Sequence, residues 1–213
     1  MTRRGFFVVL EGPEGSGKSS LIEPLAARMR ESGLDPIVIR EPGSTRAAEI
    51  ARQVLLDPDY PVGTLAELFL YLAARADLVQ QVIEPALAAG KTVLSDRFAM
   101  TTEAYQMAGR GIPADVVLPA NRAAAGGLRP DLTLIINIPY EVGRARQLAA
   151  GKRLDRIERE SPDFHRRVNQ YYLAVEGEGV RHLDGQLSPD RLLQAAWDEV
   201  ARATSERLGV ATD

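Results

Sequence analysis

Short apolar runs alternate with helix-like patterns along the whole chain of 213 residues. The runs are mostly β-branched and predict buried strands at residues 6–10, 37–39, 92–95, 132–138 and 180–183. Between them, apolar residues recur every three or four positions and predict helices at 18–32, 47–56, 65–89, 113–124, 140–150, 162–176 and 189–208. This alternation predicts an α/β fold with a doubly wound, mainly parallel sheet of about five strands flanked by helices.

The longest helical pattern covers residues 65–89. Pro85 is expected to kink its last turns, because proline lacks the N–H that a helix needs. A buried stripe is predicted for Phe69, Leu72, Ala76 and Val79. Tyr71 and Arg75 lie four positions apart on one face of this helix, so the pair is a candidate for holding a flat ligand, or it is an ordinary surface contact.

Composition narrows the class of protein. A hydrophobic fraction of 45% and a charged fraction of 26% are those of an ordinary globular chain, and we expect a single domain over residues 1–213. The net charge of −3 offers no basic footprint, so no nucleic-acid partner is expected. There is no cysteine, which excludes disulfides and thiol chemistry. Glu11 ends the first apolar run too early for a membrane span, so we expect a cytoplasmic protein with no membrane partner. Both histidines, His165 and His182, are expected at the surface.

A glycine-rich turn between the first strand and the first helix carries the strongest chemical signal. Residues 12–19, GPEGSGKS, fit the pattern G-x-x-x-x-G-K-[ST]. Glycines let backbone N–H groups surround phosphate oxygens, lysine reaches the outer phosphates and the serine hydroxyl takes a Mg²⁺ position. The alternative is a chance match on an ordinary turn, which the flanking strand and helix disfavour. The predicted ATP-binding residues are Gly12, Pro13, Glu14, Gly15, Ser16, Gly17, Lys18, Ser19 and Ser20.

Polar residues also follow the second and third predicted strands, where ligands collect in an open parallel sheet. Residues 40–45 are either a ligand loop or a Pro-Gly turn into the next helix. Asp96 stands where a Mg²⁺-organising carboxylate belongs, and Arg97 can form a forked contact with a phosphate. Residues 101–111 are polar and glycine-containing, and this stretch is a candidate for folding over a ligand. The charge run at 151–160 is either a solvated surface or a lid that brings arginines over a phosphoryl group.

Taken together, these segments resemble bacterial thymidylate kinases, which transfer the γ-phosphate of ATP to dTMP. The matching stretches are residues 11–20, 40–45, 71–75, 95–97, 101–106 with 109–111, 129–134, and 154–160 with Phe164 and Tyr172. The resemblance implies a P-loop kinase fold with a short lid at about 148–161. It also implies Mg²⁺ with ATP as donor, small-molecule nucleotides as partners, and a homodimer.

The resemblance also implies roles for individual residues. Glu14 faces the 3′-hydroxyl of the acceptor, and Tyr105 crowds the 2′ position. Arg97 holds the acceptor phosphate, helped by the loop of Glu41 and Pro42. Tyr71 stacks on the thymine, with Phe69 as a second candidate. Arg75 and Thr102 read the base edge. The acceptor set implied is Glu14, Glu41, Pro42, Tyr71, Arg75, Arg97, Thr101, Thr102, Tyr105 and Gln106, and the metal set is Ser19 and Asp96.

The sequence departs from the family's pattern at three places. Ser44 stands where a second glycine is usual, and Asn137 where aspartate is common. The P-loop position that carries a catalytic arginine in some members is Gly15, and the usual lid position is Ala150. We therefore expect Lys18 and Arg97 to share catalysis with a cation of the lid. Arg153 is the first candidate for this cation, Arg156 the second and Lys152 the third.

Two rival functions stay open from the sequence. A related kinase for another nucleotide or nucleoside acceptor would share most of these motifs. A nucleotide-binding switch or motor ATPase would share only the P-loop.

Overall fold

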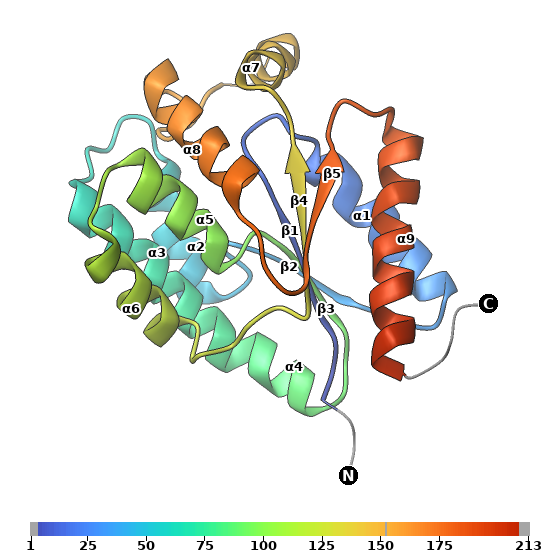
Figure 1. Ribbon diagram of the computed structural model, residues 1–213. Coiled ribbons are helices and arrows are strands. Elements are labelled where there is room, and N and C mark those ends of the chain that lie inside the picture. Colours follow the sequence, from blue (N-terminus) through green and yellow to red (C-terminus); the bar gives the residue numbers. More distant parts are fainter. Residues whose placement is uncertain (1–3, 152, 209–213) are drawn as a thin grey trace.

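The computed structural model describes residues 4–151 and 153–208. Its centre is a sheet of parallel strands in the order β2-β3-β1-β4-β5 (Figure 1). The strands are β1 (Phe7–Glu11), β2 (Ile37–Arg40), β3 (Val93–Asp96), β4 (Leu132–Asn137) and β5 (Val180–Asp184). The strand order reverses beside β1, so the loops that follow neighbouring strands diverge and leave a crevice at their carboxyl ends. The predicted doubly wound sheet is confirmed.

The helices agree with the predicted ranges to within two residues at each end, except that α5 and η2 lie in a stretch for which no helix was predicted. They are α1 (Lys18–Glu31), α2 (Arg46–Leu56), α3 (Thr64–Leu78), α4 (Glu84–Ala88), α5 (Ala99–Thr102), α6 (Ala114–Ala124), α7 (Tyr140–Ala149), α8 (Pro162–Ala174) and α9 (Pro189–Leu208). Two π-helical segments, η1 (Val79–Ile83) and η2 (Glu103–Gly109), join α3 to α4 and extend α5. Among the described residues, no helix combines the length and apolar character that crossing a membrane requires.

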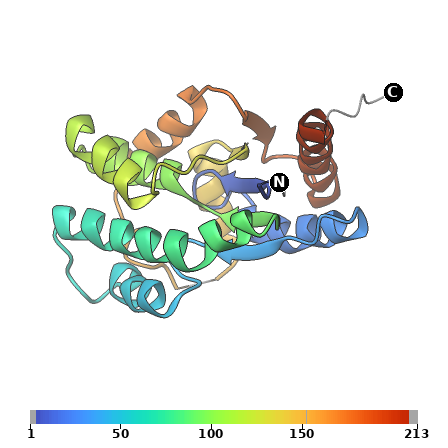
Figure 2. The same ribbon diagram turned by 90° about the horizontal axis from the view of Figure 1, so that it is seen from below.

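Alternate residues of the central strand enter two separate cores. Val8 and Leu10 are fully buried among apolar side chains of α1 and α9. Phe7 and Val9 face the other side, where they pack with residues of α3, η1 and α4. Figure 2 shows α1 and α9 together on one side of the sheet and the α3 to α4 segment on the other. Burial on both faces explains why the first strand reads as a continuous apolar run.

Three expectations from the sequence are wrong in detail. Phe69 is 56% exposed, because α3 packs between α2 and α6 and this position points outward. The stretch at 101–111, for which no helix was predicted, is largely helical, and Thr101, Thr102 and Gln106 are buried. His165 is buried too, stacked on Tyr140 with ring centroids 5.9 Å apart.

The interruption in the long helical pattern lies before Pro85. The wider turns of η1 precede the proline, which then occupies the first turn of α4. A proline near the start of a helical segment leaves an N–H position that needs no partner. The expected kink is therefore a π-helical segment followed by a new helix start.

Candidate active site

The P-loop runs from the end of β1 into α1 with three glycines in the left-handed region. Gly12, Gly15 and Gly17 have φ angles of 138°, 72° and 108°. A Cβ at Gly15 would lie 2.3 Å from the carbonyl oxygen of Gly143, so α7 packs directly against the loop. The loop geometry therefore depends on glycine both for its backbone angles and for this close approach.

The ammonium group of Lys18 lies inside the curve of the P-loop. It donates to the carbonyl oxygens of Gly12 and Pro13 at 2.8 Å each and to Ser16 Oγ at 3.2 Å. Burial, and next the positive charge of Arg97, lower the pKa of Lys18 to about 8. The lysine is thus held by neutral oxygens that a phosphate can replace.

A cavity of about 750 Å³ extends from the P-loop across the carboxyl ends of the strands. Its wall includes most residues predicted to bind nucleotides: Glu14, Gly15, Ser16, Gly17, Lys18, Ser19, Ser20, Glu41, Pro42, Tyr71, Asp96, Arg97, Thr101 and Tyr105. Within the described part of the chain, other predicted site residues lie behind or beside this wall: Gly12, Pro13, Arg75, Thr102, Gln106, Arg153 and Arg156. Lys152 lies outside the described residues.

Arg97 and Glu14 form an ion pair in this wall. Arg97 also lies over the ring of Tyr105, 5.2 Å from its centroid, and Tyr105 donates to Glu14 Oε1 at 3.1 Å. Burial opposes ionisation of Glu14, but the charges of Arg97 and Lys18 outweigh it and lower the pKa of Glu14 to about 2. The carboxylate is therefore ionised at neutral pH and holds both neighbours in place.

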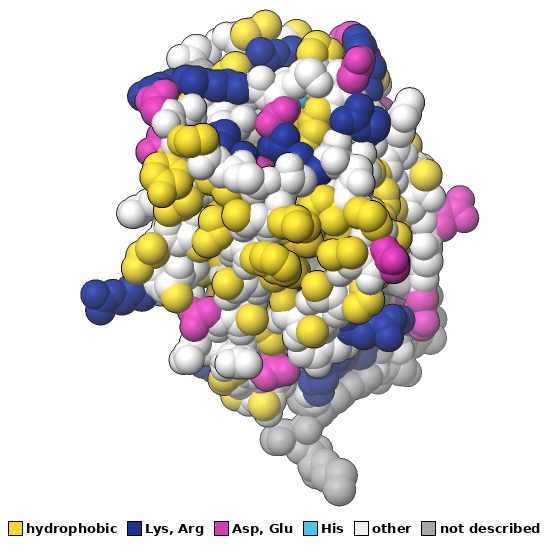
Figure 3. Space-filling view, turned by 90° about the vertical axis from the view of Figure 1, so that its left-hand side faces the viewer, with side chains coloured by type: hydrophobic (Ala, Val, Ile, Leu, Met, Phe, Trp, Pro, Cys, Tyr) yellow, Lys and Arg dark blue, Asp and Glu magenta, His cyan; other side chains and the backbone are white. Residues whose placement is uncertain are grey.

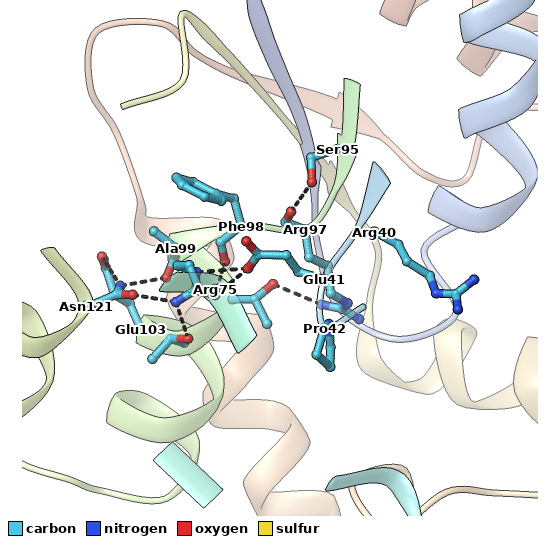
Figure 4. A network of polar contacts seen from close by, with 12 residues as sticks. Arg40, Glu41, Pro42, Arg75, Ser95, Arg97, Phe98, Ala99, Glu103 and Asn121 are labelled. Atoms are coloured by element: carbon cyan, nitrogen blue, oxygen red, sulfur yellow. Dashed lines mark hydrogen bonds and ion pairs between the residues drawn. The ribbon is translucent and has the colours of Figure 1, made fainter. Parts of the chain in front are cut away.

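The backbone of Arg97 is strained and braced. Its φ angle of 73° is unusual for a residue with a side chain. Ser95 Oγ donates to the Arg97 carbonyl oxygen at 2.6 Å (Figure 4), and the Arg97 N–H donates to the Leu10 carbonyl at 2.9 Å. These contacts aim the guanidinium into the cavity.

Glu11 is a further brace that the sequence did not reveal. Its carboxylate is fully buried and accepts from the N–H groups of Phe98 and Thr101 at 2.9 and 3.2 Å. It also accepts from the hydroxyls of Thr101 and Tyr172 at 2.7 and 2.9 Å. Glu11 thereby satisfies backbone N–H groups at the start of α5 and fixes the segment that directly follows Arg97. The only signal in the sequence was an acidic residue at the end of a buried strand.

A second buried pair lies under the acceptor side of the cavity. The Glu41–Pro42 peptide bond is cis, and Glu41 Oε2 accepts from Arg75 at 2.7 to 2.8 Å. Arg75 also donates to Thr102 Oγ1 at 2.8 Å and to Asn121 Oδ1, so its guanidinium bridges three segments (Figure 4). Burial raises the pKa of Glu41, although Arg75 acts in the opposite direction. In this arrangement the Arg75 side chain is 1% exposed and positions Glu41.

The two residues predicted to hold a metal lie on the same cavity. Asp96 ends β3, and its Oδ1 atom is buried without a hydrogen-bond partner among the described residues. Ser19 is exposed in the first turn of α1. Within the described chain, no group of three or more histidine, cysteine or acidic residues is placed to hold a metal. A cavity that presents an orphaned carboxylate oxygen and a serine hydroxyl fits Mg²⁺ that takes its other ligands from phosphate and water.

The predicted base-stacking residue, Tyr71, lies one turn before Arg75 on α3 and is 9% exposed. Burial raises its pKa, so the hydroxyl stays protonated. Gln106 is fully buried behind the wall, where its Nε2 donates to Glu67 at 2.9 Å. The structure thus brings Tyr71 to the cavity and keeps Gln106 behind it.

The lid arginines point in different directions. Arg153 is 70% exposed in its side chain and pairs with Asp59 at 2.8 Å. Arg156 points inward, where it contacts Glu67 at 2.7 Å and donates to the Leu55 carbonyl at 2.9 Å. Arg153 is therefore the one of these two with a mobile, solvent-facing cation.

The cavity is also lined by two helix arginines that the sequence did not single out: Arg52 of α2 and Arg146 of α7. Arg52 donates to the Pro42 carbonyl at 2.9 Å, and Arg146 of α7 donates to the Gly185 carbonyl at 2.8 Å. Their place follows from which helices meet over the sheet, and a pattern along one helix does not contain that information.

The departures from the family's pattern are accommodated locally. Ser44 adopts a φ angle of 69°, and its Oγ accepts from the Arg40 N–H at 2.9 Å, so a serine occupies a backbone conformation that glycine prefers. Asn137 Nδ2 lies 2.7 Å from His182 Nδ1 on the neighbouring strand. Neither residue lines the cavity within the part of the chain that the structure describes.

A parallel sheet with a P-loop after β1 and an acid and arginine after β3 defines a P-loop kinase, a phosphotransferase that acts on nucleotides. The chain belongs to the thymidylate kinase family. The model of this family, described as "Thymidylate kinase", matches residues 10–195.

Individual relatives agree with this assignment. A thymidylate kinase of Ectopseudomonas mendocina is 50% identical over 179 residues, which cover 84% of this chain and 85% of the relative. The thymidylate kinase of Pseudomonas putida strain GB-1 is 51% identical over 170 residues, 79% of this chain and 80% of the relative. That of Halothermothrix orenii is 44% identical over 200 residues, 92% of this chain and 97% of the relative.

Proposed function

We propose that this protein phosphorylates dTMP to dTDP with Mg·ATP as donor. The observation that carries the proposal is one continuous cavity whose wall includes the P-loop lysine together with Arg97, Tyr105 and Tyr71. A donor phosphate on Lys18 and an acceptor phosphate on Arg97 would meet inside it. Membership of the thymidylate kinase family favours dTMP over other acceptors.

The reaction needs little proton transfer, because the acceptor oxygen is already an anion. Positioning and charge neutralisation supply most of the catalysis. Lys18 leaves the loop carbonyls to contact the outer phosphates of ATP. Arg97 exchanges part of its contact with Glu14 for the acceptor phosphate, and its braced backbone keeps the fork in place.

The three acceptor residues that line the cavity beside Arg97 are proposed to have the roles that the resemblance implies. Tyr71 stacks on the base, and Glu14 accepts from the 3′-hydroxyl. Tyr105 fills the space beside the 2′ carbon, held there by its bond to Glu14. The remaining proposed acceptor residues support the base and the phosphate: Glu41, Pro42, Arg75, Thr101, Thr102 and Gln106.

Ser19 and Asp96 are the residues that would hold Mg²⁺. When bound, the ion would neutralise negative charge on the donor phosphates. The buried, unpartnered Asp96 Oδ1 supports this assignment.

Arg153 is our candidate for the catalytic lid arginine, with Arg156 as the second choice. Arg153 is solvent-facing and held by an exposed ion pair that contributes little. We expect Arg153→Ala to lower kcat more than it weakens binding of either nucleotide, with the free energy of unfolding unchanged. An unchanged kcat would remove Arg153 from the mechanism.

The proposal is tested by ADP release from Mg·ATP with dTMP, dUMP, dGMP, dAMP, dCMP, thymidine or no acceptor. Fast release with dTMP alone, abolished in Lys18→Ala, is the expected result. Fast release with a different acceptor would overturn the acceptor assignment and keep the P-loop kinase chemistry. ADP release that does not depend on an acceptor would favour a nucleotide-binding switch or motor ATPase.

We also propose that the chain forms a homodimer through the face of α2, α3 and α6. Figure 3 shows apolar side chains gathered in the middle of this face with charged groups around them. The exposed large apolar residues of these helices are Ile50, Leu65, Phe69, Val116 and Leu118. Such a patch marks an interface. Phe69→Asp should give a monomer by light scattering; a dimer in this variant would exclude the face.

The cytoplasmic location stays a prediction.

A further inference from the structure

A buried carboxylate outside the cavity holds two arginines from distant segments. Glu67 of α3 is fully buried, and its Oε2 contacts Arg156 at 2.7 Å and Arg110 at 2.9 Å. Its Oε1 accepts from Arg110 Nε at 3.0 Å and from Gln106 Nε2 at 2.9 Å. Burial disfavours the charged form of Glu67, but the Arg110 and Gln106 hydrogen bonds outweigh it and lower the pKa. The carboxylate is therefore a charged centre with every contact supplied by the protein.

Both arginines connect Glu67 to the lid segment, residues 148–161: one belongs to this segment and the other pairs with a residue in it. Arg156 belongs to this segment, and its Nε and N–H also donate to the carbonyls of Leu55 and Leu56 at 2.9 and 3.2 Å. Arg110 follows η2 and makes a second ion pair with Glu160, near the end of the lid. Glu67 thus fixes the lid at one point directly and at another through Arg110.

The part of the lid that Glu67 holds forms the cavity wall. Leu154 and Ile157 flank Arg156 in sequence and line the cavity, whereas Arg156 itself points the other way. On α3, Glu67, Tyr71 and Arg75 are spaced by four residues and share one helix face. One face of α3 therefore carries the lid anchor and the acceptor-side residues.

We propose that Glu67 is a positioning residue for phosphoryl transfer. Through Arg156 and Arg110 it holds the lid segment against the acceptor side of the cavity, and it touches neither nucleotide. This rests on the proposed function. It also assigns Arg156 to lid placement and leaves the transferring phosphoryl group to Arg153 and Lys18.

The first test is kinetic. Glu67→Gln keeps the shape of the side chain and removes its charge, so the folded variant should lose at least about tenfold in kcat. The Kd for dTMP alone, measured by calorimetry, should change less than about threefold, because Glu67 does not line the cavity. Glu206→Gln on α9, at an exposed pair with Arg202, is the matched control and should behave as the unmodified chain.

A double-mutant cycle separates positioning from a general loss of structure. Arg156→Gln removes one of the two arginine partners. The double variant should have a kcat no more than about threefold below that of the less active single variant, because Glu67→Gln already breaks the contact that Arg156→Gln removes. Losses that multiply would overturn the proposal. So would full kcat in folded Glu67→Gln.

A second readout does not need activity. Limited trypsin digestion followed by mass spectrometry should show faster cleavage after Arg153 and Arg159 in Glu67→Gln than in Glu206→Gln. Equal lid cleavage would exclude the anchor. If Glu67→Gln does not fold, Arg156→Gln carries the same test. An absence of dTMP-dependent ADP release in the unmodified chain would overturn the proposed function, and the digestion result would still decide whether Glu67 anchors the lid.

Discussion

Arg97 pairs with Glu14 across 83 positions of sequence, and the pair lies in the wall where donor and acceptor sites meet. One guanidinium nitrogen of Arg97 contacts the Glu14 carboxylate and the other contacts the Gly12 carbonyl and Thr101, so the guanidinium is held where it could offer two N–H groups to a phosphate. We propose that this contact marks the acceptor-phosphate site.

Arg97→Lys keeps the charge and loses the fork. We expect kcat/KM for dTMP to fall by about 100-fold, roughly 3 kcal/mol of transition-state stabilisation, while KM for ATP stays within about threefold. Steady-state kinetics with each nucleotide varied in turn measure both. Arg166→Lys, at an exposed site on α8, is the control. A loss confined to ATP binding would place Arg97 on the donor side.

Tyr105 is fixed by two neighbours, so its effect on sugar recognition is separable. Tyr105→Ala opens the space beside the acceptor sugar and should raise the relative kcat/KM for ribosylthymine monophosphate against dTMP by about tenfold. Tyr105→Phe keeps the ring and loses the hydroxyl with its bonds to Glu14 and Arg97, so it should retain the preference for deoxyribose. An unchanged preference in the alanine variant would contradict this role.

Lys18 predicts a pH dependence of ATP binding. Its pKa of about 8 without nucleotide means that the ammonium loses its proton as the pH rises above this value. ATP favours the protonated form, so the Kd for ATP should increase between about pH 8 and pH 10, and binding near pH 8 should take up a proton. Calorimetry in two buffers of different ionisation enthalpy measures this uptake. A Kd that is constant up to about pH 10 would refute it.

The sequence predicted the fold correctly, and the motifs it proposed for nucleotide binding line one cavity, because both depend on local patterns. The P-loop and the acid and arginine after β3 are contiguous, and their position at strand ends places them in one crevice. Glu11 and Arg146 were missed, because their contacts depend on how α8 and α7 pack against the P-loop. Phe69 was misassigned, since period alone does not show which side of a helix a neighbour covers.

Because Glu41 and Arg75 form a buried pair, we expect that removing the arginine alone destabilises the fold more than replacing both partners. Arg75→Met leaves a buried carboxyl group without its cationic partner and should lower the free energy of unfolding by about 3 to 5 kcal/mol, measured by urea denaturation at neutral pH. Adding Glu41→Gln removes the stranded charge and should restore part of that loss. The exposed pair of Arg166 and Asp163 provides the comparison, and Arg166→Met should cost less than about 1 kcal/mol.

Lowering the pH should reduce the loss of unfolding free energy that Arg75→Met causes. Burial already raises the pKa of Glu41, and without Arg75 the pKa rises further, so protonation at low pH removes the unpaired charge. The difference in unfolding free energy between Arg75→Met and the unmodified chain should therefore shrink as the pH falls toward about 5. A difference that is independent of pH would mean that the arginine acts through its bonds to Thr102 and Asn121 instead of its charge.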